Sequence, residues 1–233
     1  MSSAALLPWD TEFWGVRIGR VEGDTMTAAR AAELDEWAAA NEVACLYFLA
    51  GEDPATAHAA EDAGYRLMDV RVGLARPSAP AEGDPRVRPF EPGDLDALRA
   101  IARTSHGATR FYADPRFPRE RCDDLYDVWI TRSTEGWAEI VLVAEDAGRP
   151  AGYLSVHAGD RASIGLFAVA EEARGSGLGG ALVEAAVGWA AERGHREIDV
   201  VTQGRSAAAL RVYERRGFAV ESLGFWFHKW LAP

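Results

Sequence analysis

A glycine-rich turn that opens a long apolar helix constrains this chain more than any other feature. Four glycines fall within residues 175–180, between a predicted strand at residues 164–169 and a predicted helix at residues 178–193. Glycine lets the backbone approach a ligand closely, and the N–H groups at a helix start attract anions. Arg174 precedes the turn and adds a permanent cation. We therefore expect this turn to bind a diphosphate group.

The turn has three other interpretations: a dinucleotide site, a nucleotide-triphosphate P-loop and a turn without a ligand. The spacing Gly175-x-Gly177-x-x-Gly180 also satisfies the dinucleotide fingerprint, and Asp199 lies where a ribose-binding acid would stand. A dinucleotide fold, however, has its glycines directly after the strand, whereas residues 170–173 intervene here. A nucleotide-triphosphate P-loop is excluded, because no Lys followed by Ser or Thr comes after the glycines. A turn without any ligand would not require the arginine beside it.

The turn and the segments after it resemble the GNAT acetyltransferases. The usual acyl-CoA signature of that family is Arg or Gln, two residues, Gly, one residue, and Gly or Ala. This chain has the sequence Arg174-Gly175-Ser176-Gly177-Leu178-Gly179. The strand at residues 197–202, the helix around residues 207–211, Tyr213 and the pair Gly217-Phe218 resemble the closing motif of the family. The similarity spans about residues 86–230. It implies a mixed α/β sheet with the GNAT acyl-CoA acyltransferase fold, acetyl-CoA as co-substrate and no metal.

A narrower resemblance covers nearly the whole chain. The opening residues 7–15 and the stretch at residues 109–114 are similar to the dTDP-fucosamine acetyltransferase group of the family. That group acetylates the amine of a nucleotide-linked 4-amino-4,6-dideoxy sugar, so the resemblance implies such an acceptor. Two alternatives stay open: an acetyltransferase for another small amine, an aminoglycoside or a peptide N-terminus, and a non-enzymatic acyl-CoA-binding module.

The composition excludes several other classes of protein. The formal net charge is −11 and Lys229 is the only lysine, so no polybasic segment is present to bind nucleic acid or an anionic membrane. Cys45 and Cys122 are too few for a disulfide scaffold, and no apolar run approaches the length of a membrane span. The first seven residues are too short for a signal peptide. We expect a cytoplasmic protein with no membrane partner, and a homodimer is one arrangement that we consider.

The chain is expected to contain two domains. Residues 76–85 contain three prolines and a glycine without apolar periodicity, which is typical of a linker. Residues 1–80 are predicted to form a smaller αβαβ domain, and residues 86–233 the catalytic domain. Ala60 to Tyr65 repeats the helix end, glycine and aromatic of Tyr213 to Phe218, which favours a degenerate GNAT half in the first domain. The same pattern also occurs at ordinary helix ends.

The resemblance assigns roles to specific residues. Tyr213 is the expected general acid for the coenzyme sulfur, because a phenol with a pKa near 10 stays protonated at neutral pH. An aromatic ring that only packs is the alternative for this residue. Ser206 stands where the family often has Asn, and its shorter side chain puts that contact in doubt. The expected coenzyme-binding residues are Phe167, Ala168, Val169, Arg174, Gly175, Ser176, Gly177, Leu178, Gly179, Gly180 and Ser206.

The acceptor is expected near the polar stretch at residues 106–119. Arginine pairs with phosphate, aromatic rings stack on a sugar or base, and aspartate accepts from hydroxyls. The expected acceptor-binding residues are Arg110, Phe111, Tyr112, Asp114 and His157. A solvated loop is the alternative for this stretch. His106 and His157 are the imidazoles in plausible places for a base, but we assign no protein base, since water can remove the amine proton.

Overall fold

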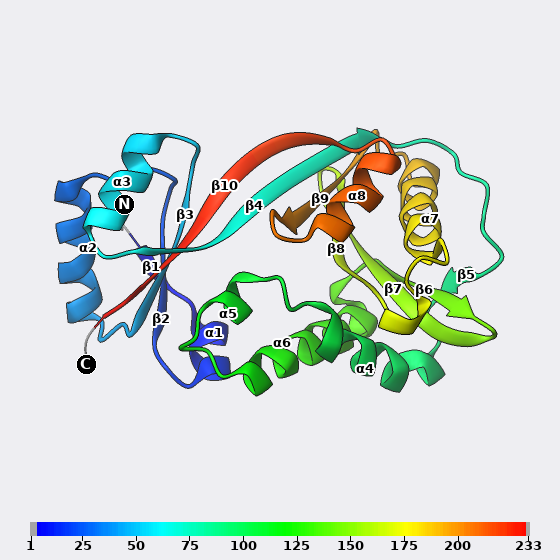
Figure 1. Cartoon of the computed structure of the whole chain (residues 1–233), viewed down its shortest axis with the longest axis horizontal. Coiled ribbons are helices and arrows are strands. Elements are labelled where there is room, and N and C mark those ends of the chain that lie inside the picture. The colour runs from blue at the N-terminus through cyan, green and yellow to red at the C-terminus, as the bar shows by residue number, and fades with distance from the viewer. Residues whose placement is uncertain (1–3, 232–233) are drawn as a thin grey trace.

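A single mixed sheet runs through the described part of the chain, residues 4–231, in the computed structural model of this protein (Figure 1). The strand order is β1-β2-β3-β10-β4-β9-β8-β7-β6-β5, ten strands in all among these residues. The pairs β2–β3 and β8–β9 are parallel, and the other neighbours are antiparallel. The predicted mixed α/β fold is confirmed.

The elements of the first part alternate between strands and helices. They are β1 (Ala4–Leu6), α1 (Pro8–Trp14), β2 (Ile18–Val21), α2 (Ala28–Ala40), β3 (Cys45–Ala50), α3 (Pro54–Asp62) and β4 (Arg66–Pro77). The αβαβ run from α2 to β4 agrees with the sequence pattern. The pattern did not predict β1, α1 and β2, because the strands have only 3 and 4 residues and α1 only 7, too few to show a clear period.

The second part begins with an edge strand and three helices. These are β5 (Val87–Pro89), the short η1 (Pro92–Asp94), α4 (Leu95–Ser105), α5 (Arg110–Ala113), α6 (Arg119–Arg132) and η2 (Ser133–Trp137). The remaining elements are β6 (Ile140–Asp146), β7 (Arg149–Ala158), β8 (Ala162–Val169), η3 (Glu171–Ala173), α7 (Leu178–Glu192), β9 (Glu197–Gln203), α8 (Ala207–Arg215) and β10 (Ala219–Trp230).

Two long strands, β4 and β10, join the two parts of the chain. They form the ribbon that crosses the molecule in Figure 1, and β10 also pairs with β3. Residues 78–84, within the expected linker, carry no helix or strand. The expected boundary and the degenerate first domain both stay predictions, and the observed sheet is continuous across them.

Helices cover both faces of the sheet around β7 and β8. Tyr153 of β7 bonds to His106 at the end of α4, whereas a side chain at the neighbouring Gly152 would meet Leu182 of α7. Because successive strand residues face opposite sides, α4 and α7 lie on opposite faces. Figure 1 shows α4, α5 and α6 running along one side of the sheet and α7 and α8 on the other.

Candidate active site

The sheet opens between β8 and β9. These parallel strands pair only at their beginnings, where Ala162 stands opposite Ile198 and Ile164 opposite Val200. Beyond that point β8 stays paired with β7 only, and β9 stays paired with β4 as far as Gln203. One edge of β8 is therefore left without a neighbouring strand, and its unpaired backbone can bind an extended ligand.

A bulge in β8, where Gly165 and Leu166 stand opposite the single residue Ser155 of β7, marks the position where β8 and β9 separate. The register between β7 and β8 shifts between Leu154 and Val156, and the hydroxyl of Ser155 accepts a hydrogen bond of 2.8 Å from the backbone N–H of Leu166. Within the bulge, a Cβ atom at Gly165 would lie 2.5 Å from His157 Nε2 and 2.8 Å from Ser155 Oγ. Only glycine fits at that position, which explains the residue at the start of the opening.

The opening holds a cavity of about 160 Å³. Tyr213 lines it with a side chain that is only 2% exposed, and its hydroxyl forms no hydrogen bond with any residue in the range 4–231. Burial raises the pKa of this phenol, so the group keeps its proton throughout the neutral range. The ring packs against Phe167 and Phe218, with centroids 5.7 and 5.5 Å away. The arrangement leaves a proton donor directed at no protein acceptor.

An uncharged imidazole lines the same cavity. His106 Nε2 lies 2.8 Å from the hydroxyl of Tyr153, and its ring stacks on Tyr126 with centroids 4.2 Å apart. Burial lowers the pKa of His106 to about 4, because the charged form loses its hydration there. At neutral pH this residue is therefore a neutral hydrogen-bonding group.

A groove of about 650 Å³ continues from the cavity to the glycine-rich turn. The six backbone N–H groups of residues 175–180 donate no hydrogen bond within the described chain. The start of a helix normally leaves four N–H groups free, so this turn offers two more. Gly177 adopts φ +88° immediately before α7, a left-handed conformation that costs an L-residue strain. The groove therefore ends in an array of unused donors at the positive end of the 15-residue α7.

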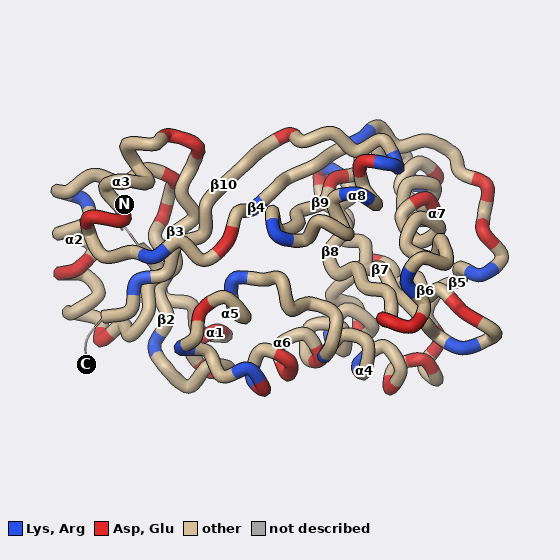
Figure 2. Tube along the Cα trace, in the orientation of Figure 1, with Lys and Arg blue, Asp and Glu red and all other residues tan. Residues whose placement is uncertain are grey.

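Arginines surround the groove. Those that line it are Arg174, Arg205, Arg215 and Arg216, and Figure 2 shows basic positions at both ends of α8. Arg86 supports the turn by donating to the carbonyl oxygen of Ser176 at 3.2 Å. In a chain with net charge −11, this local concentration of cations favours an anionic ligand at the groove.

Most of the residues predicted to bind the coenzyme lie along this groove. It is lined by Phe167, Val169, Arg174, Gly175, Gly177, Leu178, Gly179, Gly180 and Ser206. Ala168 is buried beside it, and the hydroxyl of Ser176 donates to the carbonyl oxygen of Ala173 at 2.6 Å. Ser206 takes the N-cap position of α8, but its side chain makes no capping hydrogen bond. The roles of these residues stay predictions.

The structure brings together the predicted acceptor residues of α5 and its C-cap Asp114; Phe111 and Asp114 are buried, and Arg110 and Tyr112 are half-buried. The Arg110 guanidinium lies 4.1 Å from the ring centroid of Tyr47 and 4.4 Å from that of Trp226, and it contacts His228 Nε2 at 2.9 Å. Asp114 accepts hydrogen bonds of 2.7 Å from His228 and from Trp230. These polar groups are thus already used in internal contacts.

The other predicted acceptor residues are also held by the protein. Phe111 is 4% exposed, and the hydroxyl of Tyr112 donates to Asp123 at 2.5 Å. His157 lies beside Gly165, and its Nδ1 donates to the carbonyl oxygen of Trp137 at 3.0 Å. None of the five lines the cavity or the groove, and their contact with an acceptor stays a prediction.

Sequence analysis missed several residues of this site. Gly165, Thr202 and Gln203 line the cavity, and three of the four groove arginines had no motif to mark them. Asp69 of β4 is 4% exposed, and its Oδ1 lies 4.0 Å from Arg205 Nε without a hydrogen-bond partner among the described residues. Burial raises the pKa of Asp69 to about 6. No local sequence pattern marks these residues, because only the pairing of strands that are distant in the chain brings them together.

Two other features are absent from the described residues. Within residues 4–231, no three His, Cys, Asp or Glu side chains come together in a way that could hold a metal ion. Over the same residues, every helix is too short or too polar to cross a lipid bilayer.

Comparisons with known proteins agree with the geometry. Residues 96–218 match the Acetyltransferase (GNAT) family. The chain is 31% identical over 176 residues to the dTDP-fucosamine acetyltransferase of Escherichia coli O6:H1, covering 73% of this chain and 75% of that protein. It is 29% identical over 143 residues to the spore coat polysaccharide biosynthesis protein SpsD of Bacillus subtilis, covering 61% of this chain and 50% of that protein. It is 32% identical over 160 residues to the mycothiol acetyltransferase of Clavibacter sepedonicus, covering 65% of this chain and 48% of that protein. The chain therefore spans about half the length of the last two relatives.

Solved structures share the fold over the full chain. A GCN5-related N-acetyltransferase from Sphaerobacter thermophilus superposes with a TM-score of 0.67 at 20% identity, covering 99% of this chain and 76% of that one. A functionally unknown conserved protein from Staphylococcus epidermidis gives a TM-score of 0.69 at 16% identity, covering 100% and 93%. The predicted fold and family are confirmed, and this chain belongs to the GNAT family of N-acetyltransferases.

Proposed function

We propose that this protein transfers the acetyl group of acetyl-CoA to the amine of a nucleotide-linked amino-deoxy sugar. The observation that carries the proposal is the opening between β8 and β9, which contains the free hydroxyl of Tyr213 and leads to the glycine-rich turn. A donor, an acceptor and a proton source can meet there. The acetyltransferase chemistry follows from the family, and the acceptor is the part that is proposed.

The groove suits the donor in three respects. Coenzyme A carries a diphosphate, which six unused N–H groups at residues 175–180 can bind with Arg174 beside them. Its further phosphate can meet Arg215 or Arg216 at the end of α8. Its pantetheine arm carries amides, which can pair with the open edge of β8 in the manner of an added strand.

The reaction needs one proton donor. The acceptor nitrogen attacks the thioester carbonyl carbon, a C–N bond forms, and the C–S bond breaks as the thiolate leaves. Tyr213 gives its hydroxyl proton to that sulfur, and water receives the proton from the amine and restores the tyrosine. The amine must arrive uncharged, because its lone pair makes the bond. His106, neutral at pH 7, can accept a hydrogen bond on this path without holding a charge.

The nucleotide-linked acceptor is supported by two relatives. The names of the Escherichia coli and Bacillus subtilis proteins refer to a dTDP sugar and to a polysaccharide. The mycothiol acetyltransferases favour a second candidate, a small amine without a nucleotide. A homodimer stays a prediction.

An acceptor panel tests the proposal. The purified chain is incubated with acetyl-CoA and with a dTDP-linked 4-amino-4,6-dideoxy sugar, the same free amino sugar, or an aminoglycoside, and thiol release is measured. We expect the nucleotide-linked sugar to give a kcat/KM at least tenfold above the others. A preference for a free amine would select the second candidate. Absence of heat on titration with acetyl-CoA would remove every enzymatic interpretation.

A further inference from the structure

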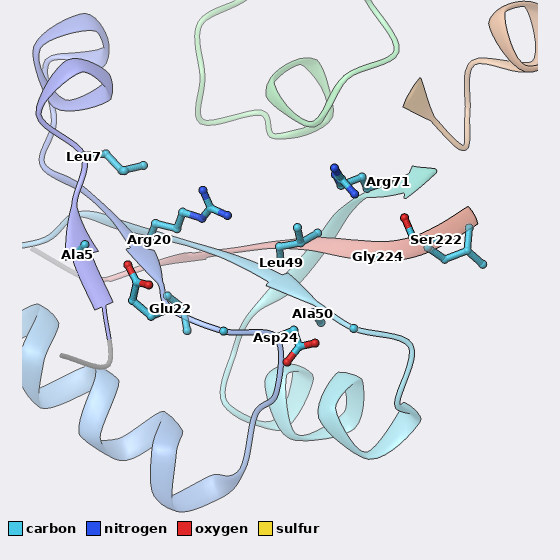
Figure 3. A pocket seen from close by; sticks show the side chains of 14 residues that line it. Ala5, Leu7, Arg20, Glu22, Asp24, Leu49, Ala50, Arg71, Ser222 and Gly224 are labelled. Carbon is cyan, nitrogen blue, oxygen red and sulfur yellow. The ribbon is translucent and has the colours of Figure 1, made fainter. Parts of the chain in front are cut away.

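We infer that Arg20 and Arg71 form a binding site for the diphosphate of a nucleotide-linked acceptor. The inference rests on the proposed function and adds to it a location for the nucleotide. The two arginines line a pocket of about 500 Å³ on the first part of the sheet, outside the groove described above. In Figure 3 both side chains extend from their strands into the same space, Arg20 from β2 and Arg71 from β4.

Neither guanidinium group has a carboxylate partner among the described residues, and the Arg20 guanidinium lies 5.8 Å from the ring centroid of Trp226. Neither forms an ion pair within 4.0 Å or a hydrogen bond with any residue of the described range 4–231. Arg71 is half-buried, and loss of hydration lowers its pKa; the charge of Asp199 opposes this shift and the charge of Arg20 adds to it. A partly desolvated cation without a counter-ion is costly, and a bound anion would remove that cost. The half-buried Arg71 and the exposed Arg20 together suit a group with two negative charges.

The pocket lies on the acceptor side of the sheet. Arg71 stands opposite Gly224 of β10, and directly opposed residues share a face. Trp226, two residues further along β10, points to that same face and packs against Arg110 of α5. The pocket therefore opens on the face covered by α5, whereas the glycine-rich turn begins the helix α7 on the opposite face. A nucleotide placed here does not compete with the coenzyme for space.

The pocket also lies at a suitable distance from the point of acetyl transfer. Arg71 pairs across the sheet with Gln203, which lines the cavity of Tyr213. Neighbouring strands are about 4.8 Å apart, so one strand spacing separates the backbone of Arg71 from that of a cavity residue. A sugar ring between them would put its amine in the cavity and its anomeric phosphate near Arg71. The second phosphate would then extend toward Arg20.

Acidic residues occupy the other end of the pocket. Glu22 and Asp24 follow β2 and line the pocket beyond Arg20. Carboxylates repel phosphate but accept hydrogen bonds from sugar hydroxyls. Along the pocket, starting from Gln203, the cations Arg71 and Arg20 thus come first and the carboxylates come after them. This order matches a diphosphate followed by a nucleoside, and it does not match a polycationic acceptor.

Direct binding of dTDP tests the inference without relying on turnover. The full chain is first saturated with coenzyme A, so that the groove is filled, and is then titrated with dTDP by calorimetry. Thymidine serves as the ligand without phosphate. We expect dTDP to bind, thymidine to bind at least tenfold more weakly, and Arg71→Gln and Arg20→Gln each to raise the Kd for dTDP about tenfold or more.

The chain offers a matched control in Arg66→Gln. Arg66 is also an arginine of β4, but it is exposed and lies outside the pocket. This variant should keep the wild-type Kd for dTDP. An unchanged Kd for acetyl-CoA in every variant shows that each has folded. The inference is overturned if wild type binds no dTDP, or if the variant that combines Arg20→Gln with Arg71→Gln binds dTDP as tightly as wild type.

Steady-state kinetics separate this inference from the proposed function. With a dTDP-linked amino sugar, Arg71→Gln should raise the acceptor KM about tenfold and leave the acetyl-CoA KM unchanged. If the sugar nucleotide is acetylated but the KM of the variant does not change, the proposed function stands and the subsite is wrong. If dTDP binds through both arginines but no sugar nucleotide is acetylated, the proposed function fails and the subsite stands.

Discussion

Tyr213→Phe is the change that tests the proposed chemistry most directly. The substitution removes one hydroxyl and keeps the ring, which packs against Phe167 and Phe218. Because the hydroxyl has no hydrogen-bond partner within residues 4–231, its loss leaves no protein group unsatisfied. We expect the free energy of unfolding to change by less than about 1 kcal/mol. Any larger effect on turnover therefore reports on catalysis.

The size of that effect follows from the surroundings of the hydroxyl. Burial alone raises the pKa of Tyr213, which means that a negative charge at this place is strongly disfavoured. A thiolate leaving into the same cavity meets the same environment and needs the proton. General acids contribute about 100-fold or more to rate, and 100-fold corresponds to about 2.7 kcal/mol. We expect kcat of Tyr213→Phe to fall at least 100-fold.

The assay compares two quantities in two variants. Thiol release at saturating substrates gives kcat, and calorimetry gives the Kd for acetyl-CoA, which should stay within about threefold because the ring is kept. Tyr65→Phe is the matched control, since Tyr65 is 2% exposed and its hydroxyl also lacks a partner among the described residues, but it lies in the other apolar cluster. The control should keep wild-type turnover. The reasoning is refuted if Tyr213→Phe retains more than a tenth of wild-type kcat.

Three further predictions concern the backbone and the titration of the site. Gly177→Ala places an L-residue at φ +88°, which should lower the free energy of unfolding by roughly 1–2 kcal/mol and weaken acetyl-CoA binding. The control Gly148→Ala, at φ +74° in the β6–β7 turn, should destabilise the fold by a similar amount without changing the Kd for acetyl-CoA. Ser155→Ala leaves the buried N–H of Leu166 unpaired, so urea unfolding should show a loss of about 1–3 kcal/mol; no loss would remove the bulge from the explanation of the opening. The pKa of His106 is about 4 and those of the cavity tyrosines are raised, so no cavity group titrates between about pH 5 and 9. The log of kcat/KM should therefore rise with pH until the acceptor amine is deprotonated, and this limb should move when an amine of different pKa is used. Asp69, outside the cavity, has a pKa of about 6, so an inflection near pH 6.5 would contradict the assignment only if it is the same for both acceptors and is kept in Asp69→Asn.

The glycine-rich turn and the position of Tyr213 in α8 could be predicted from sequence because their determinants are local. The turn at residues 175–180 depends on glycines that are neighbours in the chain, on a strand directly before it and on a helix directly after it. Tyr213 lies in a motif that ends at Gly217, where the positive φ of 78° marks the end of α8. Each of these features is encoded within a few residues, so its pattern survives without the rest of the fold.

The surroundings of the expected acceptor residues could not be predicted in the same way. Arg110 and Asp114 have residue types suited to a nucleotide sugar, but contacts with β10, more than a hundred residues away, occupy them. Arg20 and Arg71 carry no motif, and they come to one pocket only because β10 lies between β3 and β4. Residue type alone therefore does not reveal which arginines are free to bind a ligand.

This difference has a consequence for the evolution of specificity in such a fold. A coenzyme held by main-chain N–H groups is insensitive to most side-chain substitutions, so the groove at residues 175–180 can stay constant while other positions change. The inferred acceptor subsite, by contrast, consists of the side chains of Arg20 on β2 and Arg71 on β4. Replacing Arg20 or Arg71 would remove a cation that forms no ion pair within residues 4–231, so it should cost the sheet little. Relatives with acceptors of different charge should therefore differ first at these two positions and keep the glycine-rich turn.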